Sequence, residues 1–322
     1  MNESQPARRA APTAASTYSV PVPSNDDSTP LAAAAQEHVS LLQRASAISR
    51  FDRPTNTRVF VVANQKGGVG KTTTTVNVAA ALALKGLEVL VVDLDPQGNA
   101  STALNVPHAE GTPGVYEAIV EGTALEQLVQ ACPDIPGLTV LPASIDLAGA
   151  EIELVSLVAR ESRLDRALQS YIAEREAVGR RLDYVLIDCP PSLGLLTVNA
   201  MVAGREVLIP IQCEYYALEG LGQLIRNIDL IRAHLNPKLE VTTILLTMYD
   251  GRTRLSAGVA EEVRGHFGDK VITTPIPRSV RISEAPSYQQ SVITYDGTSS
   301  GALSYLEAAR EIALAGSGRV TR

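Results

Sequence analysis

A strand, a glycine-rich loop and a helix in direct succession constrain this chain more than any other feature. Val59–Ala63 is a continuous apolar run, typical of a strand buried on both faces. The loop follows at once, and a helical pattern over Thr72–Lys85 begins where it ends. Small residues let successive backbone N–H groups point inward, and the helix N-terminus adds partial positive charge. The succession therefore predicts a seat for phosphate anions.

The loop follows the general pattern G-x-x-x-x-G-K-[ST] with one departure. Lys71 is placed to reach the β- and γ-phosphates of a nucleotide, and the Thr72 hydroxyl to ligate Mg²⁺. Gln65 stands where the pattern has its first glycine, and a second lysine, Lys66, precedes a glycine pair. We expect Lys66, at the outer lip, to point away from its own nucleotide and to be free to touch a phosphate on another subunit. The predicted nucleotide-binding residues are Lys66, Gly67, Gly68, Val69, Gly70, Lys71, Thr72 and Thr73.

Acidic residues follow two other predicted strands. Asp93 and Asp95 come at the end of the apolar run Val89–Asp93, and Asp188 ends another run. Because parallel strands end at one edge of an open α/β sheet, we expect these carboxylates beside the phosphate loop. A strand-end aspartate can hold the Mg²⁺ shell, so Thr72 and Asp188 are the predicted metal residues.

Apolar runs alternate with helical patterns along the rest of the chain. Two-sided strands joined by helices predict an α/β fold, with a doubly wound, mostly parallel sheet flanked by helices. Beside the elements named above, the predicted strands are Leu138–Leu141, Tyr184–Asp188, Val207–Ile211, Val241–Thr247 and Val271–Thr274, and the predicted helices are Ile152–Glu174 and Leu221–Leu235.

The two ends of the chain differ in composition from its middle. Residues 1 to about 35 are rich in Ala, Pro, Ser and Thr and carry almost no large apolar side chains. We interpret residues 1–50 as a disordered N-terminal extension, with a short amphipathic helix as an option over 37–51. One domain over 58–316 and a flexible tail over 317–322 complete the predicted division.

Composition limits where the protein acts and what it binds. The 322 residues include 28 Lys and Arg against 35 Asp and Glu, a net charge of −7, so any binding of nucleic acid must be local. The three cysteines are widely spaced and form no C-x-x-C pair, which fits a reducing cytoplasm. No stretch approaches the roughly 18 apolar residues of a spanning helix. We therefore expect a cytoplasmic protein without a membrane partner.

Taken together, the motifs resemble the ParA/Soj family of partition ATPases, within the deviant Walker A class of P-loop proteins. The resemblance extends from Val59 to about Ala315. It implies the P-loop NTPase fold and slow, Mg²⁺-dependent hydrolysis of ATP by positioning and charge stabilisation. Five blocks in family order carry it, namely Lys66 to Thr73, Asp93 to Asn99, Ile187 to Pro191, Thr247 to Asp250 and Pro277 to Pro286.

The resemblance also implies roles for particular residues. Lys66 matches the signature lysine that crosses an ATP-sandwich dimer, Lys71 holds the phosphates, and Asp95 matches the aspartate that orients the attacking water. These three are the predicted catalytic residues. Asp188 matches the aspartate that acts on Mg²⁺ through water.

By the same resemblance, the C-terminal part supplies contacts to the base and to DNA. Pro277 and Ser279 match the segment that holds adenine, with Ser279 standing where the family often has asparagine. Arg252 and Arg281 match arginines used for sequence-independent binding of double-stranded DNA. Residues 249–282 carry six basic and four acidic side chains, a local charge of +2 in an acidic chain. Phosphate contacts of this kind are expected to be salt-sensitive.

The function that the resemblance implies is an ATP-dependent switch. ATP closes a homodimer, the dimer binds nucleoid DNA, and a ParB-type centromere-binding partner stimulates hydrolysis during segregation of a chromosome or plasmid. The alternative is a MinD-like positioning ATPase on a membrane or protein matrix, although Leu303–Leu314 lacks the basic amphipathic character of a membrane-surface helix. An electron-transfer protein like the nitrogenase iron protein is disfavoured, because Cys189 is better explained by packing at a strand end.

Overall fold

The computed structural model describes residues 36, 39–40, 42–43, 50–214 and 217–317. Residues 39, 40, 42 and 43 are helical, whereas 50 and 51 are not. The rest of the predicted extension over 1–50 and of the optional helix over 37–51 lies outside the described residues, as do residues 318–322 of the predicted tail. None of the described helices is long and apolar enough to cross a membrane.

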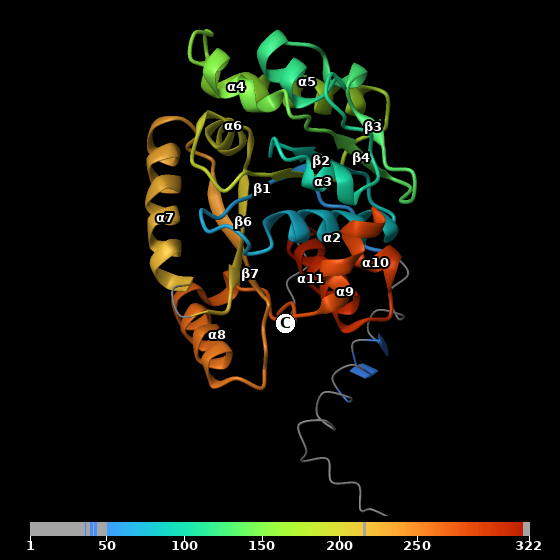
Figure 1. Ribbon diagram of the computed structural model, residues 1–322, viewed down its shortest axis with the longest axis vertical. Coiled ribbons are helices and arrows are strands. Elements are labelled where there is room, and N and C mark those ends of the chain that lie inside the picture. The colour runs from blue at the N-terminus through green and yellow to red at the C-terminus, as the bar shows by residue number, and fades with distance from the viewer. Residues whose placement is uncertain (1–35, 37–38, 41, 44–49, 215–216, 318–322) are drawn as a thin grey trace, which may run out of the picture.

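A seven-stranded sheet runs through the molecule in the order β3-β4-β2-β5-β1-β6-β7 (Figure 1). Neighbouring strands are parallel except at one edge, where β3 is antiparallel to β4. The prediction of a mostly parallel sheet is confirmed. The strands are β1 Arg58–Val62, β2 Val89–Asp93, β3 Gln130–Ala131, β4 Leu138–Leu141, β5 Tyr184–Asp188, β6 Glu206–Gln212 and β7 Glu240–Thr247.

Helices cover both faces of this sheet, so the sheet is doubly wound (Figure 1). One face carries α2 Lys71–Leu84, α3 Asn99–Ala103, α9 Val280–Glu284, α10 Val292–Tyr295 and α11 Ser300–Gly316. The other carries α4 Leu147–Leu154, α5 Arg163–Ala177, α6 Leu195–Ala203, α7 Ala217–His234 and α8 Arg254–Phe267. Five short helical turns are η1 Glu117–Glu121, η2 Leu125–Gln127, η3 Arg160–Ser162, η4 Gly268–Lys270 and η5 Ala285–Tyr288.

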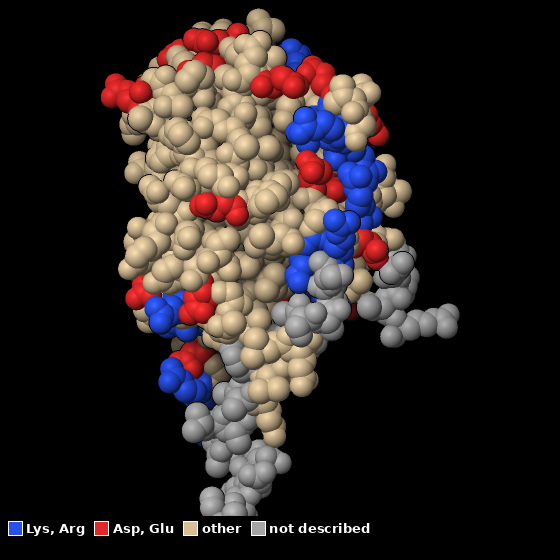
Figure 2. Space-filling view, turned by 90° about the vertical axis from the view of Figure 1, so that its right-hand side faces the viewer, with Lys and Arg blue, Asp and Glu red and all other residues tan. Residues whose placement is uncertain are grey.

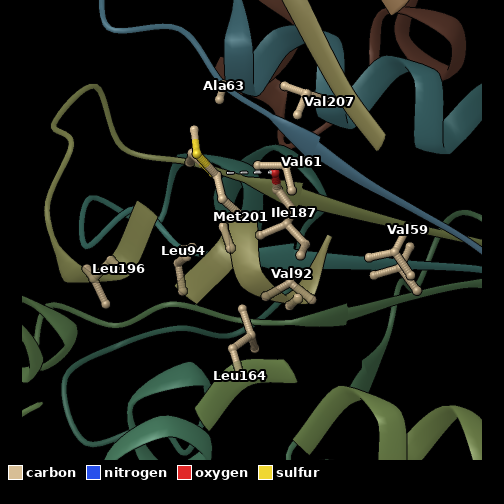
Figure 3. Packing of buried hydrophobic residues seen from close by; sticks show 14 of the residues in the cluster. Val59, Val61, Ala63, Val92, Leu94, Leu164, Ile187, Leu196, Met201 and Val207 are labelled. Atoms are coloured by element: carbon tan, nitrogen blue, oxygen red, sulfur yellow. Dashed lines mark hydrogen bonds between the residues drawn. The ribbon is translucent and has the colours of Figure 1, made fainter. Parts of the chain in front are cut away.

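The central strands are apolar along most of their length because each of their faces packs against a helical layer. Successive side chains alternate between the faces, so that Val61 of β1 enters one apolar cluster and Val62 the other. In the first cluster, Met201 of α6 and Leu164 of α5 pack with Val61 and Ile187 (Figure 3). This two-sided burial fixes the strands, and the ends of the strands position the site.

The predicted strand over Val271–Thr274 is wrong. Val271 makes an isolated bridge to β7 and the Ile272 N–H donates to the Ile244 carbonyl of β7 at 2.9 Å, but the two N–H groups after that turn elsewhere. Those of Thr273 and Thr274 donate to the carboxylate of Glu311 in α11, at 2.8 and 3.1 Å. A side chain from another element therefore takes the hydrogen bonds that a strand would need.

The predicted helix over Ile152–Glu174 is also wrong as a single element. The chain breaks between α4 and α5, where Ala159 adopts the left-handed region at φ +53°. The other predicted strands agree with the structure to within one residue at each end, and the helix predicted from Leu221 begins four residues earlier, at Ala217. The two-residue strand β3 has no counterpart among the predictions.

Candidate functional site

The loop between β1 and α2 lies at the carboxyl edge of the sheet, and distant residues hold its shape. Gly68 and Gly70 have φ of +73° and +88°, the left-handed region that glycine enters without strain. Gly70 precedes the first residue of α2, Lys71. The hydroxyl of Thr247, at the end of β7, donates to the carbonyl of Val69 at 2.8 Å. The loop is thus formed by its own glycines and braced by another strand.

The start of the loop is fixed by Asn64, whose amide donates to the Pro210 carbonyl at 2.8 Å and whose Oδ1 accepts the Lys66 N–H at 3.0 Å. The Lys66 ammonium group lies 3.0 Å from Oε2 of Glu214, and Arg278 approaches the same carboxylate at 4.0 Å. In the single chain, Lys66 is therefore paired with Glu214, and its contact with a phosphate on another subunit stays a prediction. Glu214 lies 148 residues away in sequence, so no local pattern indicates this pair.

Asp188 is the last residue of β5 and is fully buried. Its Oδ1 accepts a 3.0 Å hydrogen bond from the Thr75 hydroxyl, and its Oδ2 has no hydrogen-bond partner within the described part of the chain. Burial and the nearby Asp93 raise the pKa of Asp188 to about 8, while the hydroxyls of Thr72 and Thr75 act in the opposite direction. An unpartnered carboxylate oxygen near a threonine hydroxyl suits a hard cation such as Mg²⁺, which prefers oxygen ligands. The residues present therefore fit the predicted metal.

Lys71 is 7% exposed at the first position of α2. Burial lowers the pKa of its ammonium group, and the carboxylates of Asp188 and Asp95 act in the opposite direction. A desolvated cation at a helix N-terminus is stabilised by an anion of high charge. The position is suited to the phosphates of a nucleotide.

The loop after β2 is held by a buried carboxylate. Asp93 accepts hydrogen bonds from the N–H and hydroxyl of Ser101, at 2.8 and 2.7 Å, and burial raises its pKa to about 6. Asp95 is less buried, and its Oδ1 accepts the Gln97 N–H at 3.1 Å. Asp93 and Asp188 are register partners of β2 and β5, so the predicted meeting of carboxylates at one edge is confirmed. The support that Asp93 gives to the loop after β2 could not be predicted from the sequence pattern.

A pocket of about 390 Å³ opens beside the phosphate loop. It brings Gly70 and Thr73, at the start of α2, together with Pro277 and Ser279, roughly two hundred residues later. Backbone hydrogen bonds that join Tyr249 to residues 276 and 278 hold the later segment against the end of β7. The remaining lining residues are Thr247, Met248, Ile276, Arg278, Ile282, Ser283, Pro286 and Tyr305.

The two predicted DNA-binding arginines are exposed and paired with nearby carboxylates. Arg252 is 86% exposed and donates two hydrogen bonds to the carboxylate of Asp250, at 2.9 and 2.8 Å. These hydrogen bonds lower the pKa of Asp250 to about 2. Arg281, in α9, lies 3.2 Å from Glu284 and 3.4 Å from Asp296. Surface pairs of this kind are weak and exchange readily with other anions.

The sheet, the phosphate loop and the strand-end aspartates together define a P-loop ATPase. A family model described as an AAA domain matches residues 57–241. The sporulation initiation inhibitor protein Soj of Bacillus subtilis is 51% identical over 80% of this chain and 99% of its own length. The chromosome partitioning protein ParA of Caulobacter vibrioides is 49% identical over 79% of this chain and 93% of its own. The chain belongs to the Soj/ParA family.

Solved structures support the same class. Cobyrinic acid a,c-diamide synthase from Mycobacterium smegmatis, with a bound ATP analogue and magnesium, aligns with a TM-score of 0.68 at 38% identity, covering 82% of this chain and 97% of its own. The cell division ATPase MinD of Pyrococcus furiosus aligns with a TM-score of 0.64 at 26% identity, covering 79% and 98%. The predicted fold and ATPase class are confirmed, and the predicted cofactors, ATP and Mg²⁺, agree with the ligands of the first of these neighbours.

Proposed function

We propose that this protein is an ATP-dependent dimerising switch that binds DNA without sequence preference and segregates a chromosome or plasmid. A ParB-type partner stimulates its slow ATP hydrolysis, and the protein acts in the cytoplasm on the nucleoid. The observation that carries the proposal is the loop with two lysines, one buried at the helix start and one at the outer lip, beside Asp95 and Asp188.

The buried part of the site binds and aligns ATP. Lys71 and the loop N–H groups hold the β- and γ-phosphates, and Thr72 and Asp188 hold Mg²⁺, Asp188 through water. Mg²⁺, when bound, neutralises charge on the phosphates. Asp95, fixed by the Gln97 N–H, orients the attacking water.

The base and sugar of ATP occupy the 390 Å³ pocket. Pro277 and Ser279 line it together with Thr73, so the segment that contacts the base and the helix that follows the phosphate loop border the same pocket. Apolar contact with a planar base and one hydroxyl for its polar edge is a combination common in small-molecule sites.

Lys66 supplies the link between subunits. In the single chain its ammonium group pairs with Glu214, both side chains being over 40% exposed. The phosphates of a partner's ATP offer more charge than one carboxylate, so the lysine exchanges Glu214 for them when two ATP-bound chains meet. ATP favours the dimer because it binds this state better than the monomer.

Arg252 and Arg281 make phosphate contacts with DNA after dimerisation. We expect co-sedimentation with non-specific DNA for wild type only with ATP, and loss of binding at moderate salt or in Arg281→Glu. Arg166→Glu, a change of an exposed arginine in α5, is the matched control and should bind normally. ATP-dependent dimers that bind no DNA at low salt would refute this function. Binding of such dimers to liposomes or to a protein matrix would support the MinD-like alternative.

Asp95→Ala provides a second test. The variant should keep ATP and stay dimeric on DNA, because the contacts that close the dimer do not require the attacking water to be aligned. Light scattering with ATP measures this directly, and a monomeric Asp95→Ala protein would contradict the cycle.

A further inference from the structure

The segment that leads into the base pocket depends on a side chain of α11 for its hydrogen bonds. Two of the residues from 273 to 278 are prolines, which have no N–H group, so the segment offers four backbone donors. Those of Thr273 and Thr274 donate to the carboxylate of Glu311, one to each oxygen, at 2.8 and 3.1 Å. The other two donate to backbone carbonyls within and just after β7. Glu311 therefore accepts half of the backbone donors that hold this segment.

The two prolines make the segment stiff. Pro275 follows Thr274 directly, and Pro277 lines the base pocket two residues later. A proline fixes its own φ and restricts the residue before it to extended conformations. A displacement of Thr274 is therefore passed on to Pro277 and to Ser279, which lines the same pocket.

Helix α11 is itself fixed against α2, the helix that follows the phosphate loop (Figure 1). Ala308 and Ala309 of α11 are fully buried in the apolar cluster that also contains the inner side of α2. Tyr305 is buried, lines the base pocket, and places its hydroxyl 3.4 Å from that of Thr74 in α2. Glu311 thus connects the base segment to a helix whose position relative to the phosphate loop is fixed.

The first turn of α11 lies against the other end of the same segment. A Cβ atom on Gly301 would lie 2.7 Å from Cδ1 of Ile282 and 3.6 Å from Cβ of Ser279. Only a residue without a side chain allows this close approach. The base segment is therefore held by α11 at two places, by packing at Gly301 and by hydrogen bonds at Glu311.

We propose that Glu311 is a positioning residue for the nucleotide base. It holds Thr273 and Thr274, and through them it keeps Pro277 and Ser279 at the distance from the phosphate loop that an adenine nucleotide requires. Glu311 does not line the pocket, so its effect falls on nucleotide affinity and on the preference for adenine, and not on the chemical step. The inference rests on the assignment of this pocket to the base in the proposed function.

The sign of the expected effect separates positioning from charge. Glu311 and the nucleotide are both anionic, so removal of the charge alone would strengthen nucleotide binding. Figure 2 shows basic and acidic side chains interspersed along one flank of the molecule, so a single carboxylate contributes little to the long-range field. Loss of the two hydrogen bonds releases the base segment and weakens binding. Weaker binding without this carboxylate therefore indicates positioning.

The first test compares ADP with pyrophosphate, a probe that has no base. In isothermal titration calorimetry with Mg²⁺, Glu311→Ala should bind ADP about tenfold more weakly than wild type, as for the loss of one or two hydrogen bonds. Both proteins should bind pyrophosphate equally. Glu311→Gln removes the same charge but keeps one oxygen that accepts a hydrogen bond, so it should lose only about two- to threefold. Glu262→Ala removes an exposed glutamate of α8 and, as the matched control, should bind as wild type does.

The second test separates binding from chemistry. For Glu311→Ala the KM for ATP should rise about tenfold, while kcat at saturating ATP stays within about twofold of wild type, the pattern for a lost binding interaction. The ratio of the dissociation constants for GTP and ATP should fall severalfold, because a displaced segment distinguishes the two bases less well.

Three results would overturn the inference: unchanged ADP affinity in Glu311→Ala, an equal loss for ADP and pyrophosphate, or a marked fall in kcat. The last two would assign Glu311 to the general stability of the site. Wild type that binds ADP no better than pyrophosphate would refute the base pocket of the proposed function, and the inference with it. Failure of wild type to bind DNA would refute the proposed switch alone, since the nucleotide measurements do not depend on DNA.

Discussion

The phosphate site and the arginine surface, which we propose binds the phosphates of DNA, present their cations in opposite ways. Lys71 is buried at 7% exposure and Asp188 fully, with hydrogen bonds from elements far apart in the chain fixing their surroundings. Arg252 is 86% exposed and its guanidinium group pairs with a carboxylate two residues away. Burial strengthens the interaction between charged groups and holds them in one fixed geometry. Exposure to solvent weakens the interaction and allows the charged groups many geometries. A reaction at one phosphate group therefore requires buried, fixed charges such as Lys71. Binding that moves over many DNA phosphates requires exposed charges such as Arg252.

The comparison predicts that the two regions respond differently to loss of one cation. Lys71→Ala should lower kcat for ATP hydrolysis by about 100- to 1000-fold, because a cation fixed in a dry site acts directly on the transferred phosphoryl group. Burial lowers the pKa of Lys71, which means that the charged ammonium group destabilises the folded chain when no nucleotide is bound. The melting temperature of the variant should therefore not be lower than that of wild type. Lys270→Ala, an exposed lysine paired with Glu240, is the control and should change neither quantity. A marked loss of melting temperature in Lys71→Ala would show that the ammonium group stabilises the fold.

A smaller effect is expected for a residue that supports the phosphate site without touching the nucleotide. Thr75→Val keeps the shape of the side chain and removes the donor to Asp188. We expect hydrolysis to fall about tenfold and the free energy of unfolding to fall by about 1–3 kcal/mol, the range for leaving a buried polar group unsatisfied. Thr74→Val is a matched control in the same helix, since the Thr74 hydroxyl faces Tyr305 at 3.4 Å rather than a carboxylate. Equal losses in hydrolysis for both variants would show that the Asp188 contact has no special role.

The two regions also differ in what the sequence reveals. The phosphate loop is contiguous, and buried strands have an apolar signature, so the loop and the sheet could be predicted from local patterns. Other residues support the site from positions that no local sequence pattern indicates, namely Thr75, Glu214 and Thr247. Their contacts arise from tertiary packing. The failure at Val271–Thr274 has the same origin, because Glu311 of α11 takes the N–H groups that a strand would pair.

On the arginine surface, removing one cation should have a modest and purely electrostatic effect. Arg252→Ala is expected to weaken DNA binding about 3- to 10-fold and to reduce the slope of log affinity against log salt by about 1, as for the loss of one phosphate contact. Hydrolysis without DNA and the melting temperature should stay as in wild type, since exposed surface pairs contribute little. Anisotropy titrations at several salt concentrations measure the slope. An unchanged slope would remove Arg252 from the DNA surface.

The smallest effect tests whether the carboxylate beside Arg252 competes with DNA. Asp250→Asn removes the negative charge and should raise DNA affinity about 2- to 3-fold, because the guanidinium group no longer has to leave an anion. The pKa of Asp250 is lowered to about 2, so its carboxylate is ionised throughout pH 5–8 and the gain should be equal at pH 6 and pH 8. Asp229→Asn, which breaks the exposed pair with Arg232 in α7, should leave affinity unchanged. If Asp250→Asn weakens binding instead, the carboxylate orients Arg252 for DNA, and the exposed region then shares the fixed geometry of the buried one.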